Sequence, residues 1–472
     1  MKSEIRNTSY ESHKAYFGYR LLAVQRYGRL VNDLLFRTLP PLDVEVTMTP
    51  EQIEELGPAF ADYLRQFLFC CDYTQTFDLL SVYCCGLLSD LPRKTCEPVA
   101  LAAGVAVRTL QEFLRDHCWS FAAVRTQLQQ HVAATLPHLP DDDLGCVGLH
   151  DETGTVKDGY CTPGVQRQYC GEIGKLENCI VTVHTGLAKG RYKTLFDAEL
   201  FLPQSWDADR QRCRQARIPD ERHYRPKWQI ALAQLDRALS NGIVFDWFTF
   251  DEGYGDKPGY LQGLEQRPIR FVGEVPKSFR CFGSRPRPGQ TASRADDLVR
   301  HSPLFHEQSG QVVSLARQTL GAQPWQVKAA RVWLAWGGER TYWLLWTRNE
   351  RTGEEKYFVS NALADEPVAR VLRAGFCRWH VEHGIRLSKS ELGFRHFEGR
   401  SYVALLRHMT LCCVTLTFVA GQAADLRGEK PGSDGGAGVP GAERGVRGVA
   451  GRVAWDEPVA AHVVGHYLSP AA

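Results

Sequence analysis

RWHVEHGIRLSK, residues 378–389, is the stretch around which this chain of 472 residues is organised. Read as a helix, it places Arg378, Glu382, Arg386 and Lys389 on one side, because residues three, four and seven apart share a helical face. A carboxylate ringed by cations could hold a metal ion beside a phosphate backbone. The same pattern also describes a solvated helix with ion pairs between neighbouring turns, so the stretch alone leaves both interpretations open.

Two isolated aspartates upstream extend this carboxylate site. Residues 144–150 (LGCVGLH) predict a strand ending on Asp151, and residues 243–250 (IVFDWFTF) predict a second strand ending on Asp251. If these strands are neighbours in a mixed sheet covered on both faces, their carboxylates meet at one edge, where a helix can deliver Glu382. Three carboxylates repel one another unless a cation is bound, and oxygen-only ligands select Mg²⁺ or Mn²⁺. Two such ions could promote in-line cleavage of a phosphodiester.

Composition describes an ordinary globular protein. Apolar residues make up 44%, charged residues 23%, and the net charge is +2, which does not itself indicate a nucleic-acid binder. Residues 210–227 are dense in Arg and could follow a phosphate backbone or form a solvated loop. The fifteen cysteines include no CxxC pair, so neither a zinc ribbon nor a thioredoxin-type site is expected. Without a secretory leader they are expected to be buried, reduced thiols. We expect no secretory leader and no apolar run of the ~18 residues that a membrane helix needs.

The N-terminal region predicts helices. Residues 19–39, 50–91 and 110–136 carry apolar residues at three- and four-residue spacing. Residues 98–118 predict two short helices around Gly104, the shape of a helix-turn-helix that would offer Arg108, Gln111 and Arg115 to a DNA groove. A plain helical hairpin that packs its own core fits the same pattern equally well.

Changes of pattern divide the chain into five parts. A helical region precedes an α/β core, and a β-rich segment interrupts this core. The core then resumes with a helix at 368–389 and an apolar helix at 402–420. The Gly-rich tail is expected to be disordered. The predicted boundaries are 1–140 (helical), 141–277 (core, first part), 278–362 (β-rich insertion), 363–422 (core, second part, with the Glu helix) and 423–472 (tail).

The combined motifs resemble the DDE transposases of bacterial insertion sequences, whose catalytic core has the ribonuclease H fold. That family carries Tyr-x2-Arg-x3-Glu-x6-Lys around its third acidic residue, and Arg378, Glu382 and Lys389 match at this spacing. Gly375 occupies the Tyr position and departs from the pattern. The blocks HDETGTVKDG around Asp151 and FDEGYG around Asp251 are similar to the family's first two acidic blocks. The resemblance covers roughly residues 55–420.

The resemblance implies an α/β protein with a ribonuclease H-like mixed sheet flanked by helices, interrupted by a β-rich insertion and preceded by an all-helical N-terminal domain. It implies a transposase that binds the inverted-repeat ends of its element, cleaves them with two Mg²⁺ (or Mn²⁺) ions and joins the 3′-hydroxyls to target DNA. Its partners would be double-stranded DNA and a second copy of the chain, in the bacterial cytoplasm at the nucleoid, with no membrane. A catalytically silent DNA-binding relative and a metal-dependent nuclease of the same fold are the alternatives. The expected catalytic and metal-binding residues are Asp151, Asp251 and Glu382, and the expected DNA contacts are Arg378, Arg386, Lys389, Arg108 and Arg115.

Overall fold

The computed structural model describes residues 50–140, 142–317 and 321–425. At residues 50–55, 316–317, 321–322 and 379–383 the description covers the backbone alone. The helix expected at 19–39 and the tail from residue 426 onward lie outside the described residues.

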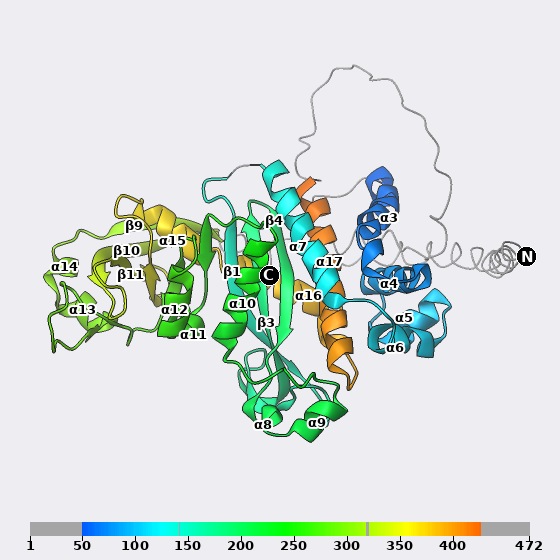
Figure 1. The fold of residues 1–472 in the computed structure, drawn as a ribbon. Coiled ribbons are helices and arrows are strands. Elements are labelled where there is room, and N and C mark those ends of the chain that lie inside the picture. The colour runs from blue at the N-terminus through cyan, green and yellow to red at the C-terminus, as the bar shows by residue number, and fades with distance from the viewer. Residues whose placement is uncertain (1–49, 141, 318–320, 426–472) are drawn as a thin grey trace, which may run out of the picture.

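A mixed five-stranded sheet forms the middle of the molecule (Figure 1). β1 lies between antiparallel β3 and parallel β5, while β2 and β4 both pair with β3. Most side chains of β1 and β3 are buried without alternation, because helices cover both faces of the sheet. The strands are β1 (Val147–Val156), β2 (Gln166–Cys170), β3 (Lys175–Lys189), β4 (Tyr192–Leu200) and β5 (Trp247–Thr249).

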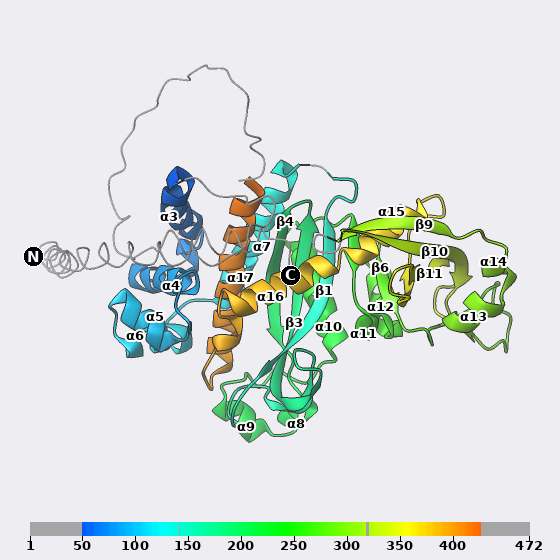
Figure 2. The ribbon, with the colours of Figure 1, turned by 180° about the vertical axis from the view of Figure 1, so that it is seen from behind.

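Different helices cover the two faces. Helix α10 (Lys227–Ser240) lies over β3 on the face seen in Figure 1, and α16 (Trp379–Ser390) crosses β1, β3 and β4 on the face seen in Figure 2. Helix α17 (Tyr402–Asp425) packs along β4. Shorter elements connect these layers, namely α8 (Gln204–Asp207), α9 (Arg210–Gln215), α11 (Glu252–Gly255), α12 (Pro258–Glu265), α15 (Val368–Phe376) and η3 (Phe394–His396). This arrangement fits the ribonuclease H-like fold expected from the sequence.

The expectation that no apolar run is long enough for a membrane helix is wrong for α17. By length and composition this helix could cross a membrane, but 94% of its most apolar window is buried inside the protein. It is the helix around which the N-terminal helices gather. Buried Arg407 donates to the carbonyls of Phe113 and Leu114, each at 3.2 Å, and Tyr83 bonds His408 at 2.8 Å. Its apolar surface is therefore protein core.

The described N-terminal residues are helical as far as His138. The elements are α3 (Pro50–Arg65), η1 (Leu68–Cys70), α4 (Thr74–Leu87), α5 (Cys96–Ala103), α6 (Val107–Arg115), α7 (Phe121–Thr135) and η2 (Leu136–His138). α7 packs against both β4 and α17, which joins these helices directly to the central sheet.

A second sheet continues from the edge of the first. Phe248, in β5, pairs with Phe271, which leads into β6, and the strand order there is β6-β12-β11-β10-β9. Gly337 and Gly338 lie in the turn that joins β10 to β11. The elements of this region are β6 (Val272–Val275), β7 (Arg280–Cys281), β8 (Ser293–Arg294), α13 (Ala295–His301), α14 (Pro303–His306), β9 (Gln311–Arg317), β10 (Gly321–Trp333), β11 (Thr341–Asn349) and β12 (Glu355–Ser360).

The helices expected at 50–91 and 110–136 are each divided into shorter ones, and three boundaries near the expected site also differ. β1 does not end at Asp151 but continues to Val156, because it is paired with β3 along its whole length. β5 is only three residues long. The helix expected at 368–389 is divided at Cys377 and Arg378, although both residues keep helical dihedral angles. The two helices pack on different strands, α15 on β5 and β6 and α16 across β1, β3 and β4.

Candidate active site

Asp151 lies on β1, and Asp251 lies two residues beyond the end of β5, the parallel neighbour of β1. β1 and β5 pair with Leu149 opposite Thr249, an offset of 100 residues. The same offset separates Asp151 from Asp251, just beyond the last paired residues. Neighbouring strands are about 4.8 Å apart, so the register, continued two residues past the last pair, would bring these two predicted residues close together at one end of β5.

Backbone contacts hold both carboxylates in place. Asp151 is 9% exposed, and its Oδ1 accepts a hydrogen bond from the backbone N–H of Glu152 at 2.7 Å. Asp251 caps α11, because its Oδ1 accepts from the backbone N–H of Tyr254 at 3.2 Å. The guanidinium of Arg378 lies 3.8 Å from Asp151 Oδ2. Two carboxylates are thus fixed near the end of β5, and the Arg378 guanidinium lies close to one of them.

The buried hydroxyl of Tyr254 lies close enough to these carboxylates to be affected by their charge. Burial raises the pKa of its hydroxyl well above the usual value, and the charges of Glu152, Asp251 and Asp151 raise it further. Within the described part of the chain this buried hydroxyl makes no hydrogen bond. Glu152 is bound by Lys227. The carboxylates of Asp151 and Asp251 are oxygen donors of the kind that suit a hard divalent cation such as Mg²⁺ or Mn²⁺. The imidazole of His184, which pairs with Asp151 across β1 and β3, is buried beside them.

The third predicted acid, Glu382, lies in the first turn of α16. Its side chain falls outside the described residues, so its distance from the aspartates is not part of this structure. Among the described side chains no three His, Cys, Asp or Glu residues gather as a metal-binding group. The backbone nevertheless starts α16 beside Asp151, because Arg378, the residue before the helix, contacts that carboxylate.

The three cations predicted around Glu382 do not share one exposed face. Arg378 and Lys389 are only 21% and 12% exposed, and both are turned toward β1. Lys389 Nζ donates to Glu172 Oε2 at 3.0 Å and to the carbonyl of Gly154 at 3.4 Å. Arg386 is exposed. Arg378 and Lys389 therefore contact carboxylates of the sheet side, which a fully solvated helix would not show.

The predicted helix pair around Gly104 is present. Gly104 has φ +69 and ends α5, and α6 then buries Leu110, Phe113 and Leu114. Its opposite side exposes the three polar residues predicted to face DNA, Arg108, Gln111 and Arg115. The hairpin thus packs its own core and also presents a polar outer face, so the two interpretations are compatible.

Two partners of the site were missed in the sequence. Lys227, at the start of α10, binds Glu152, and Glu172, in the turn between β2 and β3, binds Lys389. Each pair joins residues far apart in the chain, and no spacing rule connects them. The one related signal was the density of cations at 210–227, for which a solvated loop was the more common explanation and a phosphate contact the alternative.

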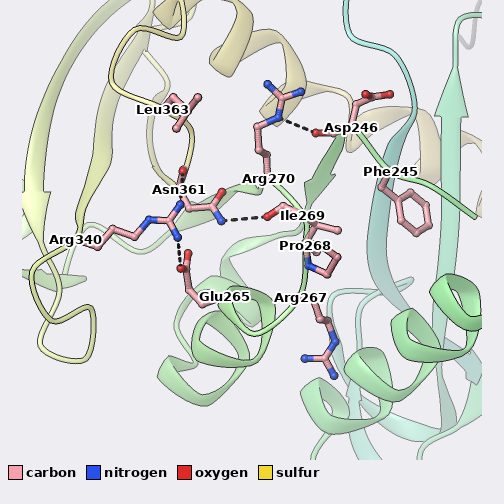
Figure 3. A pocket seen from close by; sticks show the side chains of 10 residues that line it. All are labelled: Phe245, Asp246, Glu265, Arg267, Pro268, Ile269, Arg270, Arg340, Asn361 and Leu363. Carbon is pink, nitrogen blue, oxygen red and sulfur yellow. Dashed lines mark hydrogen bonds and ion pairs between the residues drawn. The ribbon is translucent and has the colours of Figure 1, made fainter.

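A separate cavity of about 370 Å³ lies between the two sheets (Figure 3). Arg270 and Arg340 reach into it, but Arg340 is bound by Glu265 at 2.6 Å and Arg270 by Glu366 at 3.0 Å. Asp246, in its wall, precedes β5, whereas Asp251 follows β5. The cavity therefore opens at the opposite end of that strand from the paired aspartates and does not include them.

This mixed α/β sheet has one aspartate on β1 and a second just after the parallel strand β5, an arrangement typical of the class of enzymes that hold divalent cations through oxygen ligands. Comparison with known proteins identifies the family within that class. The family model of the DDE superfamily endonucleases matches residues 66–333, more than half of the chain and a range that includes Asp151 and Asp251. The chain belongs to the DDE superfamily endonucleases, which generally use divalent metal ions.

One curated relative is the "Probable transposase for insertion sequence element IS701" of Microchaete diplosiphon. It is 24% identical over 333 residues, which cover 70% of this chain and 78% of that protein. The family expected from the motifs, the DDE enzymes of insertion sequences, is thereby confirmed.

Proposed function

We propose that this protein is a DNA transposase that binds the ends of its insertion sequence, cleaves them and joins the freed 3′-hydroxyls to target DNA. The observation that carries the proposal is the register of β1 and β5, which pairs Leu149 with Thr249 and, continued by two residues, would bring Asp151 level with Asp251. The match to the DDE superfamily endonucleases and the similarity to a probable insertion-sequence transposase support the same assignment.

In this proposal Asp151, Asp251 and Glu382 hold two Mg²⁺ or Mn²⁺ ions. When bound, the ions supply Lewis-acid stabilisation of the charge that develops on the attacking and leaving oxygens of a phosphodiester. The chain's own residues position the reactants. The N-cap at Asp251 and the backbone bond at Asp151 fix two ligands, while Lys227 holds Glu152 to one side.

Other parts of the chain would bind the DNA. We assign end recognition to an all-helical N-terminal domain (1–140) through Arg108, Gln111 and Arg115 of α6, whose outer face is exposed. Within the core (141–277 and 363–422), Arg378, Arg386 and Lys389 would contact phosphates, and the β-rich insertion (278–362) would help to hold the non-transferred strand. Pairing of two ends would require a homodimer on DNA, in the cytoplasm at the nucleoid.

The test uses duplex DNA that carries the sequences flanking the gene, with Mg²⁺ or Mn²⁺. Wild type is compared with Asp151→Asn and Glu382→Gln, and with Asp256→Asn as a matched control. Asp256 is 55% exposed, directly follows α11, and pairs only with neighbouring Lys257 among the ion pairs described. We expect cleavage at the ends and joined products from wild type and Asp256→Asn, and neither from the other two variants.

The remaining outcomes separate the alternatives. Binding of the ends without cleavage by any of the proteins would make this a DNA-binding relative without catalysis. Cleavage without joined products would indicate a nuclease of the same fold. Cleavage by Asp151→Asn or Glu382→Gln at the wild-type rate would contradict the assignment of the site.

A further inference from the structure

The turn between β2 and β3 places a carboxylate against two cations beside the candidate active site. Glu172 Oε2 lies 3.0 Å from Lys389 Nζ, and Glu172 Oε1 lies 3.5 Å from Arg395 Nη1. Lys389 is on α16 and Arg395 is on η3, so two elements converge on one anion. Two cations around one carboxylate leave a net positive charge, which is the charge balance of a site for an anionic group.

The position of this site suits a strand of DNA that enters the active site. Lys389 also donates to the carbonyl of Gly154, which is three residues beyond Asp151 on β1. At about 3.3 Å per residue this separates the two points by about 10 Å. One strand of a duplex rises 3.4 Å per nucleotide, so the separation corresponds to about three nucleotides.

The backbone that carries the two cations is held more firmly than the turn that carries the carboxylate. The backbone around Arg395 is held by Lys157, whose Nζ donates to the carbonyls of Arg395 at 3.0 Å and Phe397 at 2.6 Å. Lys389 projects from a helix packed on the sheet. Glu172, by contrast, sits in an exposed turn between Gly171 and Gly174, and nothing lies within 4 Å of where a side chain on either glycine would begin. The turn can therefore withdraw while the two cations stay in place.

We propose that Lys389 and Arg395 form a binding site for a DNA phosphate, which the Glu172 carboxylate fills in the DNA-free protein. The carboxylate stands in for the phosphodiester, and DNA binding exchanges one anion for the other. The inference rests on the proposed action on DNA. It adds Arg395 to the contact surface and makes Glu172 a side chain that opposes binding.

The test compares Glu172→Gln with wild type by fluorescence anisotropy, using a labelled duplex that carries one end of the element. Glu177→Gln is the matched control, because Glu177 lies on the same hairpin, carries the same charge and pairs with Lys175 at 3.6 Å instead of with the site. We expect Glu172→Gln to bind the duplex about five-fold more tightly at low salt, the size of one partly exposed ion pair. In a Lys389→Ala, Arg395→Ala background the gain should disappear.

A second readout distinguishes an exchanged contact from a merely structural one. Glu172→Gln should lower the melting temperature of the free protein, because the wild-type ion pairs of Glu172 stabilise only the DNA-free state. It should raise DNA affinity, because these pairs no longer have to be broken when DNA binds. Unchanged or weaker binding by Glu172→Gln, or an equal gain in Glu177→Gln, would overturn the inference. The proposed function would still stand in that case, provided that the wild-type protein binds the duplex. Failure of wild type to bind the duplex at any salt concentration would overturn both.

Discussion

Asp197→Asn should lower the free energy of unfolding by about 3 kcal/mol, because Asp197 is the buried centre of an ion network on β4. Its side chain is 0% exposed and accepts hydrogen bonds from Arg237 Nε at 3.0 Å and from Gln129 Nε2 at 3.0 Å. Arg125 lies 3.7 Å away. Glu199, two residues along the same strand, binds the other side of Arg237 at 3.1 Å.

The magnitude follows from what the substitution leaves behind. Burial lowers the pKa of Arg237, but Asp197 and Glu199 more than offset this and raise the pKa above its usual value. An asparagine would remove one of these charges and turn an N–H group toward donors that need an acceptor. Breaking a buried ion pair costs about 3–5 kcal/mol, and the lower end applies because Arg237 keeps Glu199 and is 27% exposed.

Urea denaturation followed by tryptophan fluorescence measures this loss. Asp62→Asn is the control, since Asp62 is 68% exposed and pairs with Arg65 on the surface, where such pairs contribute about 0–1 kcal/mol. In a double-mutant cycle Asp197→Asn and Arg237→Met should together cost less than their sum, because the second change removes the charge that the first leaves uncompensated. A loss no larger than that of Asp62→Asn would refute the reasoning.

Three further predictions concern the site and the core. Asp151→Asn and Asp251→Asn should each lower the rate of end cleavage about 10³-fold in a gel assay while leaving end binding within about two-fold, because each removes a metal ligand worth several kcal/mol in the transition state; a ten-fold loss or less would contradict this. Lys389→Ala should reduce the slope of log binding constant against log salt by about 0.9, as expected for one lost phosphate contact, and an unchanged slope would assign Lys389 a structural role. Burial lowers the pKa of His408 to about 4, so stability should be lost as pH falls from 6.5 to 4, by about 3 kcal/mol in total, because the unfolded chain takes up a proton there and the folded protein does not. Urea denaturation across that range should show a flatter pH dependence for His408→Asn than for wild type, and an identical dependence would contradict the assignment.

The pairing of the two aspartates could be predicted because it rests on a local pattern. Each of two apolar runs is followed by an acidic residue, and parallel neighbours in a sheet bring such positions together. The continuation of β1 could not be predicted, because residues 152–156 (ETGTV) look like a polar loop. Thr153 and Thr155 are nevertheless buried, since β3 pairs with this part of the strand and α16 packs against β1. Burial there is decided by elements far away in the sequence.

The role of each cation was the least predictable feature, because the sequence does not show which carboxylate a given Lys or Arg will pair with. Arg222 and Arg225, which could have followed a phosphate backbone, instead bind Glu199 on β4. Glu199 is 3% exposed in a paired strand, so it cannot leave these arginines when DNA arrives. Glu172 differs, because it reaches Lys389 from an exposed turn that can move. Whether a paired cation is available to DNA therefore depends on how firmly the fold holds its carboxylate partner. A chain with a net charge of only +2 could thus still present a phosphate site at its active centre, where a carboxylate on a movable turn gives way to DNA.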